Sequence, residues 1–230
     1  MIAAASVLSV GFMAYHPTIH SRDPLDFIEA VGRTALVNGI VHGSLIALLA
    51  ILFCGFTCLA SRLGLHSLTV RAGLIAYGIG LIAMVAAATL NGFILTEFVA
   101  QHRVRSSTET EAPKQVSPQA HATPHTPASA EETLRTMRHI LAYGHAANQV
   151  CSRIGVMGVS TAIVLWSLML LRRTGHSRII GILGGLAGTA LIVALLCGFL
   201  PMNVHGMLAF VATQTVWSLV VAVAMIRNHL

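Results

Sequence analysis

Residues 34–60 read TALVNGIVHGSLIALLAILFCGFTCLA and contain no Asp, Glu, Lys or Arg. A hydrocarbon core about 30 Å thick is crossed by about 20 helical residues, so this segment is long enough to span a bilayer. The segment therefore predicts a membrane-spanning helix, and it sets the length and charge pattern to look for in the rest of the chain.

Apolar segments of this kind recur along the sequence. The chain has 230 residues, of which 55% are hydrophobic and 10% charged, a balance that one soluble core of this size could not bury. We predict an all-α integral membrane protein, a bundle of six transmembrane helices in contact with lipid. The predicted spans are 2–15, 34–60, 72–100, 150–171, 179–200 and 204–226. The first is short; we interpret it as a retained helix, with a removed signal sequence as the alternative.

The charged residues predict the orientation of the bundle. With both termini inside, the inner loops and the C-terminal end contain six arginines and no acidic residue, which is the positive-inside pattern. These arginines are Arg62, Arg71, Arg172, Arg173, Arg178 and Arg227. All acidic residues and all but three of the twelve histidines then lie outside. We expect a bacterial inner (plasma) membrane with cytoplasmic inner loops, and no nucleic-acid partner, because the net charge of +6 is not gathered into one basic patch.

The segment between the third and fourth spans differs from the rest in composition. Residues 103–130 are rich in Ser, Thr, Pro and Ala and are predicted to form a flexible extracytoplasmic linker. Residues 131–147 return to helical spacing and predict an amphipathic extracytoplasmic helix, which either lies on the membrane surface or extends the fourth span outward. Recurring Gly-Phe steps suggest tandem helix-hairpin repeats, although an apolar sequence produces such matches easily.

Small residues in two spans predict close helix packing. Gly78 and Gly80 fall in the third span, and the fifth span has two pairs with GxxxG spacing. The two pairs are Gly181 with Gly185 and Gly184 with Gly188.

Polar side chains in different predicted spans lie at about the same height above the inner arginines. His42 stands 20 residues before Arg62, and His205 stands 22 residues before Arg227. At 1.5 Å of rise per residue, both histidines lie about 30 Å above the inner arginines. The same count predicts a layer of His, Glu, Asn and Cys near the outer edge of the hydrocarbon.

This layer has the residue types of a metal or haem site. Imidazole binds copper, zinc or the iron of haem b, and a helix bundle can hold ligands from different helices. His42 and His205 are the predicted pair. The candidates to complete the ligand set are Glu97, His145, His16 and Cys151. The alternative is that these groups only bond to water and headgroups at the interface, and we expect the loop histidines, His16 among them, to be solvated.

Three functions remain open on the sequence. The leading hypothesis is a membrane-embedded metal- or haem-binding protein with a redox or metal-handling role. The second is an accessory or assembly subunit that docks onto other membrane subunits or forms a homo-oligomer, and the third is a small-solute transporter or channel. The sequence contains no Walker, HExxH, GxSxG or CxxCH motif, so common catalytic and covalent-haem signatures give no support to other classes.

Overall fold

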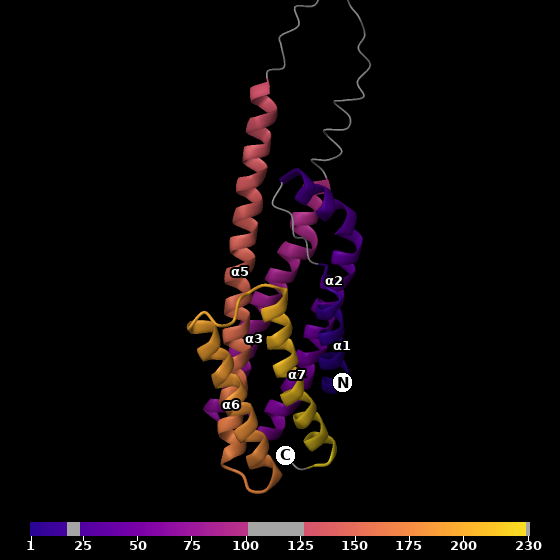
Figure 1. The fold of residues 1–230 in the computed structure, drawn as a ribbon. Coiled ribbons are helices and arrows are strands. Elements are labelled where there is room, and N and C mark those ends of the chain that lie inside the picture. Colours follow the sequence, from indigo (N-terminus) through magenta and orange to yellow (C-terminus); the bar gives the residue numbers. More distant parts are fainter. Residues whose placement is uncertain (18–23, 101–126, 229–230) are drawn as a thin grey trace, which may run out of the picture.

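A computed structural model describes residues 1–17, 24–100 and 127–228, and every regular element within these ranges is a helix (Figure 1). In chain order the elements are α1 (Ile2–Ala14), α2 (Pro24–Leu63), α3 (Leu68–Thr89), η1 (Leu90–Ile94), α5 (Pro127–Leu171), α6 (His176–Leu196) and α7 (Val204–Ile226). After the π-helical turn η1, the helix begun by α3 continues to Ala100.

Five helices are long and apolar enough to cross a membrane, as predicted for an all-α membrane protein. These are α2, the continuous helix 68–100, α5, α6 and α7. The sixth predicted span corresponds to α1, whose 13 residues cover only about 20 Å. Six spans and tandem repeats therefore stay predictions.

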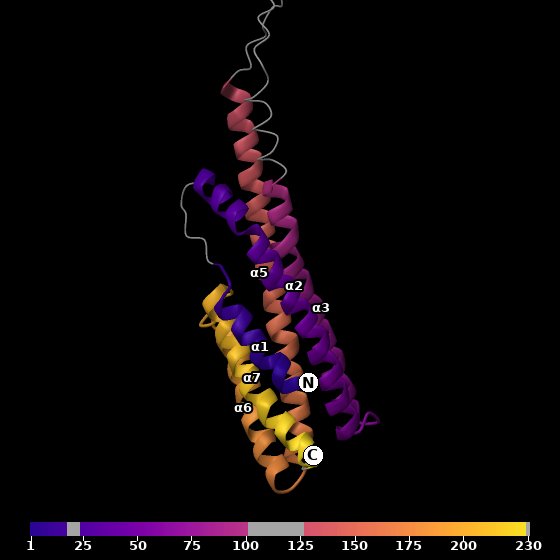
Figure 2. The same ribbon diagram turned by 90° about the vertical axis from the view of Figure 1, so that its right-hand side faces the viewer.

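Helix α5 joins two segments that the sequence suggested separately. It runs for 45 residues without a break, so that residues 131–147 extend the fourth predicted span. In both ribbon views α5 rises beyond the upper ends of the other helices (Figures 1 and 2). The predicted linker lies outside the described residues except for 127–130, which open α5.

Short loops join α2 to α3 and α5 to α6 at the lower end of the bundle in Figure 1, and the predicted inner arginines lie in or beside these loops and at the end of α7. Two of these arginines tie the helix ends together. Arg62 Nη1 donates to the carbonyl of Met225 at 2.7 Å, and Arg173 Nη2 donates to the carbonyl of Arg62 at 3.1 Å. The last carbonyls of a helix have no α-helical donors from a following turn, and these two guanidinium groups bond to such carbonyls, which links α2 to α7 and the loop between α5 and α6 to α2.

An aromatic cluster fills the core above these arginines. Phe56, Tyr77, Trp166 and Trp217 come from α2, α3, α5 and α7 and are almost fully buried. The ring of Phe56 lies 5.5 Å from that of Trp166 and 5.7 Å from that of Trp217, centroid to centroid. Aromatic pairs at this separation add to the stabilisation from buried area.

Most of the glycines predicted to support close packing do so. A Cβ on Gly80 would lie 2.8 Å from the backbone nitrogen of Val159, so α3 and α5 are in backbone contact. Gly181, Gly184 and Gly188 face α5 and Trp217 at similarly short distances. The prediction was wrong for Gly78, which has nothing within 4 Å of its Cβ position, and Gly185 makes only an ordinary contact.

Candidate histidine site

The site begins on helix α2, where Asn38 and His42 lie one turn apart on the buried face. The exposed fraction is 8% for Asn38 and 5% for His42. Nδ1 of His42 lies 2.8 Å from the main-chain carbonyl oxygen of Asn38. Because a carbonyl oxygen can only accept, Nδ1 carries the proton, and Nε2 of the neutral ring is left with a lone pair.

The second histidine comes from the segment that follows α1. His16 Nδ1 lies 2.9 Å from the carbonyl oxygen of Pro17, which assigns its proton in the same way. The two Nε2 atoms of His16 and His42 are 3.4 Å apart, and their rings meet edge to face at 75°. Two elements that are distant in the sequence thus bring two imidazole nitrogens to face each other.

The hydrogen bonds made through Nδ1 leave the Nε2 atoms of both rings as acceptors. With both protons on Nδ1, each Nε2 has a lone pair and neither ring can donate to the other. Burial lowers the pKa of the His16 imidazole from its usual 6.5, against a smaller opposite effect of the bond to the Pro17 carbonyl, so a proton is a poor bridge.

A π-helical turn lies directly against the part of α2 that carries His42. In η1 the N–H of Leu95 bonds to the carbonyl of Leu90, five residues earlier. The carbonyl of Asn91 accepts a hydrogen bond from Nδ2 of Asn38 at 2.8 Å. Gly92 lies directly against His42, because a Cβ there would be 2.4 Å from the Cβ of His42. Turns of this type are often found at functional sites, and this one fixes the helix that carries His42.

A cavity of about 490 Å³ surrounds the histidine pair. Its wall is built from α1, α2, the helix 68–100, α5 and α7, and most of it is apolar. Its polar side chains include Asn38, Asn148, Gln149 and Gln214. The cavity has the size and the character of a small-ligand site, with a few polar groups on an apolar surface.

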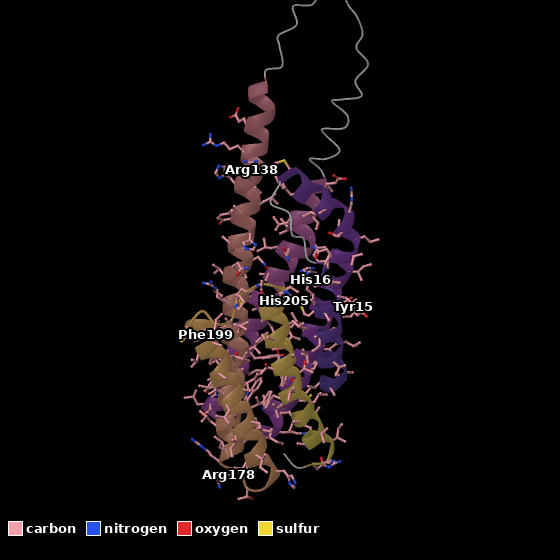
Figure 3. All side chains as sticks on the ribbon, in the orientation of Figure 1. Tyr15, His16, Arg138, Arg178, Phe199 and His205 are labelled. Carbon is pink, nitrogen blue, oxygen red and sulfur yellow. The ribbon has the colours of Figure 1, made fainter. Side chains whose placement is uncertain are left out.

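The predicted site residues divide between this cavity and the outside. His16, His42, His145 and His205 all line it. Figure 3 shows His16 and His205 at similar heights near the upper ends of α1 and α7. Glu97 and Cys151 are not among the lining residues; Glu97 is exposed and Cys151 is half-buried.

The histidines pair differently from the sequence prediction. The partner within hydrogen-bond distance of His42 is His16, and the expectation that His16 is solvated was wrong, because it is half-buried against His42. Within the described residues, no three His, Cys, Asp or Glu side chains are close enough to hold a metal ion together. The full set of predicted metal ligands is therefore not brought together by His, Cys, Asp and Glu side chains alone.

The sequence did not lead us to predict Asn38 as a residue of this site. Its position four residues before His42 puts both on one helix face, and that spacing was the available signal. Comparison with protein-family models, with curated proteins and with solved structures found no match, so the argument for this site depends on its own geometry.

Proposed function

We propose that this chain is an integral membrane protein that binds a transition-metal ion between His16 and His42 and serves in metal handling or redox transfer. The observation that carries the proposal is the 3.4 Å separation of the two Nε2 atoms. With metal–nitrogen bonds of about 2.0 to 2.1 Å, that separation corresponds to a bond angle of about 110°, which is the tetrahedral value.

The surroundings of the pair support the same proposal. A histidine that ligates a metal usually donates its other ring nitrogen to a carbonyl or carboxylate, which orients the ring. Both rings do this, to the carbonyls of Asn38 and Pro17. Both rings are therefore oriented through Nδ1, and each has its Nε2 lone pair available for a ligand.

The geometry favours a metal ion over haem b, which was the other predicted cofactor. Two histidines on opposite faces of a haem iron lie in line with it, which would separate their nitrogens by about 4 Å. The pair is closer and bent, so it suits copper or zinc with further ligands from the cavity.

The proposal places the site toward the extracytoplasmic side. The end that carries Arg62, Arg173 and Arg227 is proposed to face the cytoplasm of a bacterial inner membrane, following the positive-inside rule. The cavity lies away from that end, at the level of His16 and His205 near the upper ends of α1 and α7 (Figure 3). Partner membrane subunits or a second copy of this chain stay predictions.

Metal titration of the purified protein tests the proposal. The full chain in detergent is freed of metal and titrated with copper and zinc against a chromophoric chelator. We expect one ion per chain and at least a tenfold loss of affinity, about 1.4 kcal/mol, in His16→Ala and in His42→Ala. His139→Ala, an exposed position on α5, is the matched control. Equal affinities in all four proteins, or a haem absorption band, would contradict the proposal.

A second candidate function is binding or transport of a small apolar solute, which the cavity of about 490 Å³ favours. An apolar fluorophore distinguishes the two. If it binds in the cavity and neither His16→Ala nor His42→Ala changes metal binding, the solute function takes precedence.

A further inference from the structure

Four methionines line the cavity that contains the histidine pair. They are Met13, Met84, Met202 and Met207, and the first three are at least nine-tenths buried. They come from α1, α3, the segment before α7, and α7 itself. A thioether is a soft, polarizable ligand, and soft ligands select Cu(I) among the common metal ions.

Two of these methionines belong to segments that are fixed beside the site. The backbone N–H of His16 bonds to the carbonyl of Met13 at 3.3 Å, so one turn joins a thioether to a ligand histidine. The carbonyl of Met202 accepts from Nε2 of Gln149 at 2.7 Å. These bonds hold the backbone of both residues where each carries its side chain to the cavity wall.

The cavity wall offers neutral ligands only. Among its described lining residues there is no Asp, Glu, Lys, Arg or Cys. Transfer of an ion from water into such surroundings costs free energy that rises with the square of its charge, so a monovalent ion is penalised much less than a divalent one. Hard ions such as Mg²⁺ and Ca²⁺ need several oxygen ligands, usually carboxylates, and Zn²⁺ sites usually include an anionic ligand or a water.

We infer that the metal is Cu(I), held by the Nε2 atoms of His16 and His42 with thioether sulfur from the cavity methionines, Met13 foremost. This inference depends on the proposed metal function and specifies its ion. Imidazole and thioether together match the preference of Cu(I), and none of these ligands has to lose a proton at neutral pH.

Anaerobic titration of the full chain with Cu(I) and Zn(II), each against a chromophoric chelator, measures the selectivity. We expect Cu(I) to bind at least a hundredfold more tightly than Zn(II). X-ray absorption at the copper edge is expected to show both nitrogen and sulfur neighbours. Met13→Leu keeps the volume nearly unchanged and should weaken Cu(I) at least tenfold while leaving Zn(II) affinity as it was. Met225→Leu, at the far end of α7, is the control.

The remaining outcomes distinguish an error in the identity of the ion from an error in the proposed metal-binding function. If another methionine replaces Met13 in the single variant, the triple variant Met13→Leu, Met202→Leu, Met207→Leu must lose the sulfur neighbours and the selectivity for Cu(I). Zinc bound as tightly as Cu(I), or a copper shell of nitrogen and oxygen only, overturns the inference and leaves the metal function standing. Failure of both ions to bind overturns the metal function itself.

Discussion

The contact between Gly92 and His42 makes a sharp prediction about the histidine site. A Cβ added at Gly92 would lie 2.4 Å from the Cβ of His42 and 2.6 Å from its Cγ. Ordinary contact begins near 3.4 Å, so in Gly92→Ala helix α2 and the turn η1 must separate by about 1 Å or the imidazole must rotate. Either response changes the position of Nε2 of His42 relative to Nε2 of His16.

The expected size of this effect follows from overpacking. An extra methyl group in a packed interior costs about 1 to 3 kcal/mol. Displacing a ligand or its supporting hydrogen bond lowers metal affinity by about 10 to 100-fold. We therefore expect Gly92→Ala to lower the thermal unfolding temperature in detergent and to weaken copper binding by at least tenfold.

Gly39→Ala is the matched control for this substitution. It lies on the same face of α2, and its added Cβ would be 3.9 Å from the nearest atom of Phe93 and 4.0 Å from the carbonyl oxygen of Gly92. This variant should bind metal and unfold as the parent does. If Gly92→Ala also binds metal with parental affinity, the reasoning that the close approach of α2 to η1 builds the site is refuted.

Three further predictions concern pH, packing and orientation. Burial lowers the pKa of His16, so near pH 6.5 the folded metal-free protein binds fewer protons than the unfolded chain. The contribution of His16 to the free energy of unfolding is therefore full above that pH and is lost as the pH falls below it. Unfolding temperatures between about pH 5 and pH 8 should show this slope, and His16→Ala should reduce it. Gly80→Ala should destabilise the α3–α5 contact by about 1 to 3 kcal/mol, whereas Gly78→Ala should be neutral or slightly stabilising, as measured by denaturant unfolding. In a background with the native cysteines replaced by Ala, an impermeant maleimide should label Thr136→Cys in intact cells and Thr174→Cys only after lysis; the reverse pattern would invert the proposed orientation.

The spans could be predicted because the bilayer acts on local composition. The predicted span 204–226 coincides with α7, and the predicted span 179–200 overlaps α6 with ends that differ by three or four residues. An apolar run of sufficient length becomes a helix in lipid whatever its neighbours are, because its backbone groups must bond within the segment. The continuity of α5 was harder to foresee, because residues 131–147 are amphipathic and fit a helix on the membrane surface equally well.

The site could be predicted only in part. The height of a side chain in the membrane follows from counting residues along its helix, but the neighbour that the side chain faces depends on how the helices pack. Counting residues from the arginines predicted that His42 and His205 lie near one level, and both line one cavity. The partner of His42 depends on which helix packs beside α2 and how that helix is rotated. Those are properties of tertiary packing, and the π turn at η1 has no clear signal in one sequence.

The short helix α1 is held beside the site by contacts with α2 and α7. Ile2 is buried against Gly55, where a Cβ would lie 2.2 Å from its Cγ1. Higher on the helix, the hydroxyl of Thr215 in α7 donates to the carbonyl of Ser6 at 3.1 Å. These two contacts fix the depth of α1, which begins well above the level of the C-terminal end in Figures 1 and 2. Because these contacts set the depth of α1, they also set the height at which the segment after α1 brings Nε2 of His16 to 3.4 Å from Nε2 of His42.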